Sequence, residues 1–226
     1  MSQLIGISPE FIKQNNLRID LSRFRKELLR GSNRTVGRFD SRYLGIDTDA
    51  AGDSPETDAS SDAIAGAYIA SFQDYLHSKL GYQTDLPYRL SARDGAGFKW
   101  NWAHKAPGGG YGSQNNPNTA VDLAAAMRTN PYLKVLSLNG YYDMATPFFG
   151  TENDLGHMML DPTLQPNLRY AYYPAGHMTY LNPDALRQMK QDLAGWYDEA
   201  VSDARSSTPP VPPSSQPGTT TGETPN

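Results

Sequence analysis

The sequence contains no cysteine, which excludes disulfides, thiolate catalysis and Cys-ligated zinc, although it does not exclude export. It has no apolar run that approaches the roughly 20 residues of a membrane-spanning helix. Basic residues do not predominate, because 20 Lys and Arg face 24 Asp and Glu, for a net charge of −4. We therefore expect no membrane and no nucleic acid as partner. No motif indicates a metal or another cofactor. The length of 226 residues and the mean hydropathy of −0.60 indicate a folded, soluble chain.

The C-terminal stretch, residues 205–226, differs in composition from the rest of the chain. Its only aliphatic residue is Val211, and the others are mostly Pro, Ser, Thr and Gly. Such a segment buries too little apolar area to offset the loss of chain entropy on folding. We expect a tail that is disordered or in the polyproline II conformation.

Two charged stretches lie near the N-terminus. From Arg18 to Arg42 there are eight basic residues and three acidic ones, without the aromatic residues that would stack on nucleic acid bases, so we interpret them as a salt-bridged or solvated surface. The following stretch, 47–62, is acidic, and Asp47-x-Asp49-x-x-Gly52 resembles the start of a calcium loop. The third acidic ligand and the bidentate Glu of such a loop are absent. We therefore expect an acidic surface loop that precedes a helix.

That helix is indicated by Ser61-Asp62 as its cap, by apolar residues on one face and by Gly81 at its end. The apolar face consists of Ile64, Tyr68, Phe72, Tyr75 and Leu76. Residues 82–117 are then rich in Gly and aromatic side chains. They lack the flanking strand and helix of a phosphate-binding loop, so we expect a loop with packed aromatic residues.

From residue 131 onward the pattern alternates strands with helices. The apolar run Leu133–Leu138 predicts a short strand, and Leu168–Tyr173 predicts a second. Helices are expected after Thr146-Pro147 and from Pro183. Strand, helix, strand and helix joined by short loops predict an α/β fold.

Each predicted strand is followed by a titratable residue, Asp143 after the first and His177 after the second, 34 positions later. Parallel pairing would bring both loops to the same edge of a sheet. An Asp that accepts a hydrogen bond from His fixes the imidazole tautomer and stabilises imidazolium, as an acyl-transfer base requires. Gly176 would let the backbone turn so that the imidazole faces a nucleophile. The alternative is structural, with Asp143 as a helix cap and His177 without a chemical role.

Two segments around these residues resemble the last two triad segments of the serine carboxypeptidase family of α/β-hydrolases. They are Asn139-Gly-Tyr-Tyr-Asp143-Met-Ala-Thr-Pro147 and Pro174-Ala-Gly-His177-Met178. In that family Asp follows the penultimate core strand and Gly-His-Met follows the last. Four upstream segments look like the insertion region of bacterial members, namely Ile7-Ser-Pro-Glu-Phe11, Asn16-Leu-Arg-Ile-Asp20, Phe24-Arg-Lys-Glu-Leu-Leu-Arg30 and Val36-Gly-Arg-Phe-Asp-Ser-Arg42.

The resemblance covers roughly residues 4–200 and implies a division of the chain. Residues 1–130 would form a mainly helical cap insertion, and 131–204 the C-terminal part of an α/β-hydrolase sheet. The resemblance implies a serine-type carboxypeptidase, which releases C-terminal residues from peptides with a free C-terminus. Asp143 and His177 would be catalytic, and Met178 would lie beside the leaving-residue pocket. It also suggests export, although the first ten residues do not form a signal peptide.

The family's nucleophile is absent from this chain. No Gly-x-Ser-x-Gly elbow occurs, and the nearest substitute, Ser113, lies in a Gly-rich loop. Two short parallel strands would also leave Val135, Leu136 and Leu138 exposed, because a parallel sheet needs neighbours on its faces and edges. We therefore expect a fragment that is inactive alone and whose partner is the missing N-terminal half of the same enzyme.

Two alternatives remain at this stage. The chain could be a non-catalytic remnant that binds peptides or a partner through its aromatic cap. It could also belong to another α/β-hydrolase, such as an esterase, that has a similar Asp–His pair.

Overall fold

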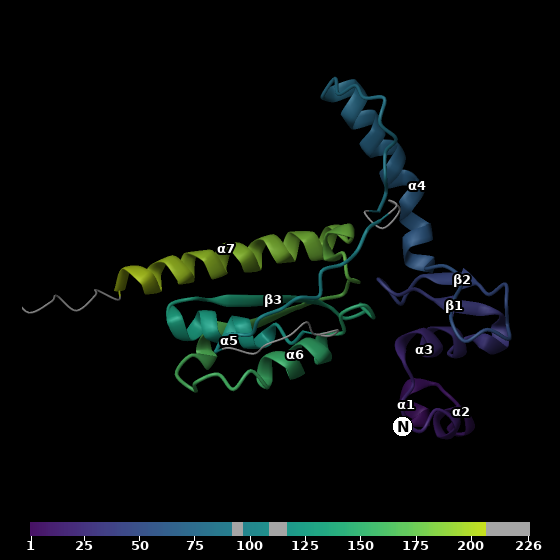
Figure 1. The fold of residues 1–226 in the computed structure, drawn as a ribbon, viewed down its shortest axis with the longest axis horizontal. Helices are drawn as coiled ribbons and strands as arrows, with labels where there is room; N and C mark the ends of the chain where they lie inside the picture. The colour runs from purple at the N-terminus through teal and green to yellow at the C-terminus, as the bar shows by residue number, and fades with distance from the viewer. Residues whose placement is uncertain (92–96, 109–116, 207–226) are drawn as a thin grey trace, which may run out of the picture.

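The computed structural model describes residues 1–91, 97–108 and 117–206 (Figure 1). Ser113 and nearly all of the predicted tail, from residue 207 on, lie outside the described residues. The elements are α1 (Ser2–Ile5), α2 (Pro9–Gln14), α3 (Leu21–Glu27), η1 (Arg30–Ser32), β1 (Arg34–Val36), β2 (Leu44–Ile46), α4 (Ala59–Asp74), η2 (Tyr75–Lys79), α5 (Ala120–Thr129), β3 (Val135–Gly140), α6 (Phe148–Gly156), η4 (Gln165–Asn167), β4 (Leu168–Tyr173), η5 (Thr179–Leu181) and α7 (Pro183–Ser206).

Strands β3 and β4 pair in parallel over their whole length, from Val135 opposite Leu168 to Gly140 opposite Tyr173. Helix α7 runs along one side of this sheet and α5 and α6 lie on the other, as Figure 1 shows. This mixed α/β arrangement confirms the predicted alternation of strands and helices. Strand β4 has the predicted bounds. Strand β3 begins and ends two residues later than predicted, because Asn139 and Gly140 continue the pairing instead of forming a turn.

Two apolar clusters hold the α/β unit together. On one side of the sheet the buried residues are Ala124, Met127, Met158, Leu160 and Leu164, against which the half-buried Val135 and Leu168 of the strands pack. On the other side Tyr173 and Ala175 pack against Ala185 of α7. Because α5 contributes Ala124 and Met127, the packed unit includes this helix together with residues 131–204.

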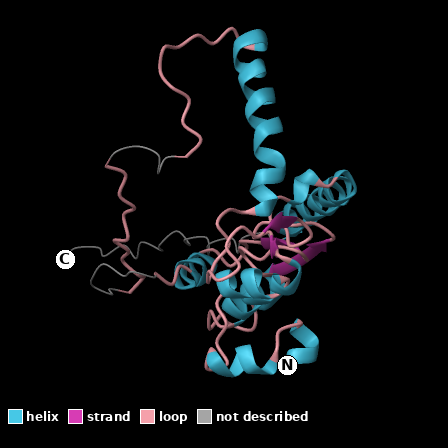
Figure 2. Cartoon of the chain, turned by 90° about the vertical axis from the view of Figure 1, so that its right-hand side faces the viewer, coloured by secondary structure: helices cyan, strands magenta, loops and turns pink. Residues whose placement is uncertain are grey.

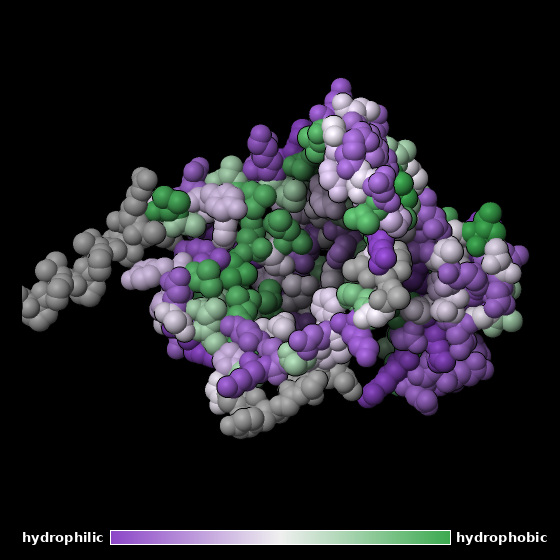
Figure 3. Space-filling model, turned by 45° about the horizontal axis from the view of Figure 1, so that its top comes forward, coloured by the Kyte–Doolittle hydropathy of each residue, from purple (hydrophilic) through white to green (hydrophobic). Residues whose placement is uncertain are grey.

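The sheet is incompletely covered. Within the described residues β3 and β4 have no further strand beside them. Leu138 is 37% exposed, and Val135 and Leu136 are half-buried, which agrees with the predicted exposure of this strand. The space-filling view shows apolar side chains gathered on the surface of the α/β unit (Figure 3).

The N-terminal unit is built around a buried ion cluster and not around a solvated charged surface. Lys26 of α3 is fully buried, and its Nζ donates to Asp47 Oδ1 at 2.6 Å and to Glu56 Oε1 at 2.8 Å. Burial opposes the charge of Lys26, but these hydrogen bonds outweigh it and raise its pKa. The expectation of an acidic surface loop holds for most of residues 48–58, which are exposed, but it was wrong for Asp47, whose side chain is fully buried and pairs with Lys26.

The contacts of Asp47 also explain why the stretch from Asp47 to Gly52 resembles the start of a calcium loop. Asp47 Oδ1 also accepts a hydrogen bond from the backbone N–H of Asp49, which is a local turn and not a ligand set. Among the described residues no group of three or more His, Asp or Glu could hold a metal ion.

Helix α4 begins earlier than predicted and extends away from the rest of the molecule (Figure 2). Its N-cap is Asp58, which accepts a hydrogen bond from Ser60 N–H, so the predicted cap at Ser61-Asp62 was wrong by one turn. The helix passes into the short π-helix η2, and Gly81, at φ +63°, follows it as expected. No described helix has the length and apolar character needed to cross a membrane.

Candidate active site

The loops that follow β3 and β4 meet at the carboxyl end of the sheet. Tyr141 N–H donates to the carbonyl of Tyr173, and Tyr142 N–H to that of Ala175, both at 3.0 Å, so the pairing continues past the strands. Asp143 therefore comes opposite His177, and His177 Nδ1 lies 2.9 Å from Asp143 Oδ2. The structure thus brings Asp143 and His177 together at one edge of the sheet, as parallel pairing of the two strands predicts.

Asp143 is held by four hydrogen bonds. Its Oδ1 accepts from the backbone N–H of Ala145 at 2.7 Å and of Thr146 at 3.0 Å. Its Oδ2 accepts from the Thr146 hydroxyl at 2.6 Å and faces His177. The side chain is only 6% exposed, and burial alone would raise its pKa, but the hydrogen bonds from Thr146, His177 and Ala145 lower the pKa below its usual range. Asp143 thus caps the following turn and contacts the imidazole at the same time.

His177 presents its second nitrogen away from Asp143. Nδ1 lies between Asp143 Oδ2 and the Thr146 hydroxyl, which is 3.2 Å away. Within residues 1–91, 97–108 and 117–206 nothing hydrogen-bonds Nε2, and the side chain is 40% exposed. A carboxylate at Nδ1 stabilises the tautomer that carries its proton there. Nε2 is then a free basic nitrogen.

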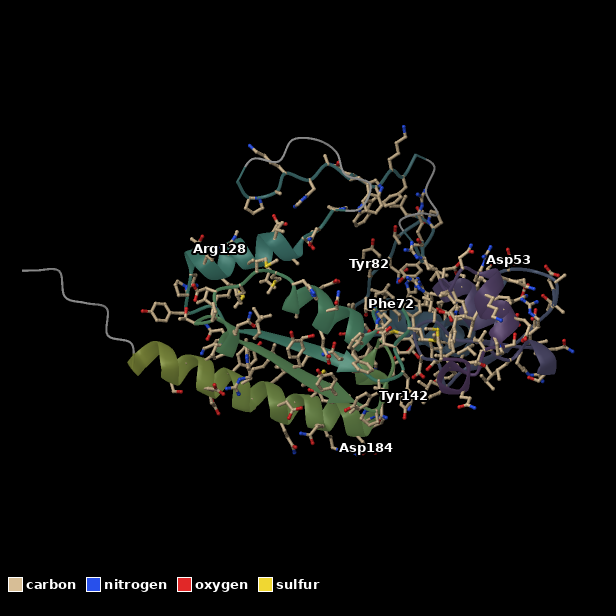
Figure 4. The ribbon with its side chains drawn as sticks, turned by 90° about the horizontal axis from the view of Figure 1, so that it is seen from below. Asp53, Phe72, Tyr82, Arg128, Tyr142 and Asp184 are labelled. Carbon is tan, nitrogen blue, oxygen red and sulfur yellow. The ribbon has the colours of Figure 1, made fainter. Side chains whose placement is uncertain are left out.

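A segment of the N-terminal unit, residues 38–42, lies directly against this edge of the sheet. The carbonyl of Phe39 accepts from His177 N–H at 2.6 Å, and that of Arg38 accepts from Met144 N–H at 3.0 Å. Ser41 N–H donates to the carbonyl of Tyr142 at 2.9 Å. In Figure 4 Tyr142 lies at the end of the sheet nearest this unit. The site is therefore built from both parts of the chain.

The sequence analysis named residues 36–42 but did not place them at this site, and it gave Gly176 another role. A Cβ on Gly176 would lie 2.3 Å from the carbonyl oxygen of Phe39. The glycine is needed for close approach of the two backbones, and not for turning the imidazole toward a nucleophile. The Phe39 ring also contacts the imidazole, with the centroids 5.2 Å apart. In the sequence, the glycine directly before His177 was the feature that could have indicated this close contact.

Met178 lies beside His177 in the wall of an apolar cavity of about 520 Å³. Ser61 is in the same wall, and its hydroxyl donates to Asp58 Oδ2 at 3.4 Å. No serine or threonine hydroxyl of the described residues hydrogen-bonds His177 Nε2. The described part of the site thus places an imidazole against a buried carboxylate, with no serine or threonine hydroxyl of the described residues at its second nitrogen.

The other histidines do not lie at the ends of the strands. His77 Nδ1 is 2.9 Å from the carbonyl of Tyr82, and His157 Nδ1 is 2.6 Å from that of Asn153. His104 forms a second His–Asp pair, with Nε2 2.8 Å from Asp122 Oδ2, which the sequence analysis missed. That pair ties the segment 97–108 to the first turn of α5.

Comparisons with known proteins give no match for this chain, whether with family models, with curated proteins or with solved structures.

Proposed function

We propose that this chain carries the acid–base half of a serine-type carboxypeptidase, with residues 131–204 as the C-terminal part of an α/β-hydrolase core. The observation that carries the proposal is the hydrogen bond between His177 Nδ1 and Asp143 Oδ2 at the carboxyl end of two parallel strands. No described residue hydrogen-bonds Nε2. The motifs around both residues, which resemble that family, supply the reaction class.

In this proposal His177 Nε2 removes the proton of a serine hydroxyl as it attacks the scissile carbonyl of a peptide. The protonated imidazole then gives that proton to the departing amino group, and the steps repeat with water to release the acyl group. Asp143 holds the ring and stabilises its positive charge, which its lowered pKa favours because the carboxylate stays ionised throughout. Met178 contacts the leaving residue.

The serine comes from a further segment, the N-terminal half of the same enzyme, which is the proposed partner. Two features of the α/β unit support this. Within the described residues no further strand pairs with β3 or β4, and Leu138 is exposed on β3. A strand paired there would cover this apolar surface and would bring its own C-terminal loop to the edge where His177 lies.

The test combines this chain with the segment encoded upstream of Met1, fused or co-expressed. We expect the chain alone to be inactive on blocked dipeptides with a free C-terminus, and the combination to release the C-terminal residue. A serine-directed phosphonylating reagent should then label a serine of the added segment. Hydrolysis of esters but not of these dipeptides would favour an esterase. A folded complex without hydrolysis, or hydrolysis that survives His177→Ala, would contradict the proposal.

A further inference from the structure

The backbone of Arg38 and Phe39 connects the candidate site with the start of helix α4. On the side of the site, the Phe39 carbonyl accepts from His177 N–H at 2.6 Å. The Arg38 carbonyl accepts from Met144 N–H at 3.0 Å, and Met144 directly follows Asp143. The N–H groups of the same two residues are bound instead by the first turn of α4. These two residues therefore bridge α4 and the loops that carry Asp143 and His177.

Two polar side chains at the start of α4 accept these N–H groups. The N-cap residue Asp58 accepts from Arg38 N–H at 2.7 Å through Oδ1. Ser60 Oγ accepts from Phe39 N–H at 3.0 Å, and its own hydroxyl donates to Asp58 Oδ1 at 2.9 Å. Because the hydroxyl proton points at Asp58, the oxygen lone pairs of Ser60 are left for Phe39. In Figure 1 this end of α4 lies beside β1 and β2.

The acceptors are shielded from water. Ser60 is 2% exposed, and the Asp58 side chain is 18% exposed. Arg25, which is buried, donates to Asp58 Oδ1 at 3.2 Å and to the carbonyl of Val36 at 2.7 Å. Burial would raise the pKa of Asp58, but the hydrogen bonds from Arg38 and Ser60 lower it below its usual range. If either acceptor were lost, a backbone N–H would be left without a partner in a site with little access to water.

Close packing leaves the bridge little freedom to move. A Cβ on Gly37 would lie 3.0 Å from Cβ of Ser60, and one on Gly176 would overlap the carbonyl oxygen of Phe39. Glycine at both positions lets the same short segment touch α4 on one side and the His177 loop on the other. Since packed interiors transmit displacements, a shift at the α4 contact also shifts the contact with His177.

We propose that Asp58 and Ser60 are positioning residues for His177, which they hold against Asp143 through the backbone of residues 38 and 39. Both loops of the site are anchored on these two backbone units. The approach of His177 Nδ1 to Asp143 Oδ2 therefore depends on the N-cap of a helix that follows neither strand of the α/β unit. The catalytic consequence rests on the proposed function, whereas the positioning itself can be measured on this chain alone.

The experiment compares two variants of the full chain that each remove one hydroxyl near the start of α4. Ser60→Ala removes the acceptor of Phe39 N–H, whereas Thr57→Val removes a hydroxyl that donates to Asp62 Oδ2 at 2.6 Å. NMR measures amide hydrogen exchange of His177 and, by long-range ¹H–¹⁵N correlation, the tautomer of its ring. Amides of α5, which has no contact with the bridge, correct for any change in global stability.

After this correction we expect Ser60→Ala to accelerate exchange of His177 N–H at least tenfold and to give a mixture of the two ring tautomers. Thr57→Val should change neither. Exchange of His177 that rises no more than that of α5, with an unchanged tautomer, would overturn the proposal, and so would an equal effect of the two variants.

If Ser60→Ala does not fold, the unmodified chain still decides. The N–H groups of Phe39 and His177 should have the same protection factor, because one opening releases both. Protection factors that differ tenfold or more would show that the two contacts open independently, which contradicts the proposal.

The conservative variant tests Asp58 separately. In Asp58→Asn the amide oxygen can still accept from Arg38 N–H and cap α4, so we expect exchange of His177 within threefold of the unmodified chain. Asp58→Ala lacks this acceptor and should accelerate the exchange at least tenfold. Equal exchange in the two variants would contradict the role of Asp58.

The positioning and the proposed function fail in different ways. In the complex with the N-terminal segment, Ser60→Ala should lower kcat about tenfold with KM unchanged, because the base is displaced and the substrate contacts are not. Faster exchange of His177 without hydrolysis in the complex would leave the positioning intact and contradict the proposed function. Hydrolysis with the same kcat in Ser60→Ala would contradict only the positioning.

Discussion

Replacing Asp143 by Asn separates its two structural roles. In the side chain as it stands, Oδ1 accepts from the backbone N–H of Ala145 and Thr146, while Oδ2 faces the Thr146 hydroxyl and His177. An Asn carbonyl can keep both backbone bonds. Its amide group would take the place of Oδ2 and donate to His177 Nδ1, which forces the ring proton onto Nε2.

The expected magnitudes follow from this geometry. Asn caps a turn about as well as Asp, so we expect stability to change by less than about 1 kcal/mol. Turnover of the complex with the N-terminal segment should fall about 10⁴-fold, or about 5 kcal/mol of transition-state stabilisation, as in other enzymes that lose this carboxylate. The assay is release of the C-terminal residue from a blocked dipeptide, with the melting temperature measured in parallel.

Asp161 offers a matched control. Its Oδ1 accepts from the N–H and the hydroxyl of Thr163, at 2.9 and 2.6 Å, and these bonds lower its pKa as well. Asp161→Asn therefore reports the loss of a carboxylate cap without loss of a histidine partner. Turnover in Asp143→Asn that stays within a few-fold of that in Asp161→Asn would refute the reasoning and leave Asp143 as a cap.

Further predictions concern the buried ion cluster, the contact between the two units and the choice of histidine. Because the pKa of Lys26 is raised and those of its two carboxylate partners are lowered, the cluster should stabilise the fold on a plateau that falls below about pH 4 and above about pH 10. Urea denaturation should show both limbs, and both should be weaker in a Lys26→Met variant, which removes the contribution of the cluster. Gly176→Ala should separate the two units, because its Cβ would lie 2.3 Å from the carbonyl oxygen of Phe39, and faster amide exchange of His177 would report this. In the complex with the N-terminal segment, His177→Ala should lower turnover by several orders of magnitude and His157→Ala should not; the opposite result would exclude His177 as the base.

Local patterns predicted the elements of the α/β unit well. Strand β4 has its predicted bounds because Leu168–Tyr173 is rich in aromatic residues, with Arg169 as its one charged residue, and is closed by Pro174. The predicted bounds of β3 were two residues too early, because Asn139-Gly140 has a composition that is typical of a turn. In the structure the Asn139 amide instead donates to the carbonyls of Ser137 and Ala171, and this keeps the segment extended. Composition indicated a turn, and tertiary contacts overrode it.

Contacts between distant segments could not be read from the sequence. The approach of Asp143 to His177 followed from parallel pairing, which is a topological rule. The burial of Lys26 against Asp47 depends on how distant segments of the N-terminal unit pack together. The docking of Phe39 on His177 depends on how the two units meet. No local period in the sequence encodes either contact. The charge runs predicted salt bridges, which are present, but they did not indicate that Lys26 and Asp47 are buried, because a pair of opposite charges can be buried as a unit.

The most direct test of the central claim is the protonation state of the His177 ring in the intact chain. A long-range ¹H–¹⁵N correlation spectrum, assigned with His177→Gln, distinguishes the two neutral tautomers. We predict that the neutral ring carries its proton on Nδ1, with Nε2 free, and that Asp143→Asn moves the proton to Nε2 while Asp161→Asn leaves it on Nδ1. A ring protonated on Nε2, or one that does not respond to Asp143→Asn, would contradict the assignment of Asp143 and His177 as an orienting carboxylate and its base.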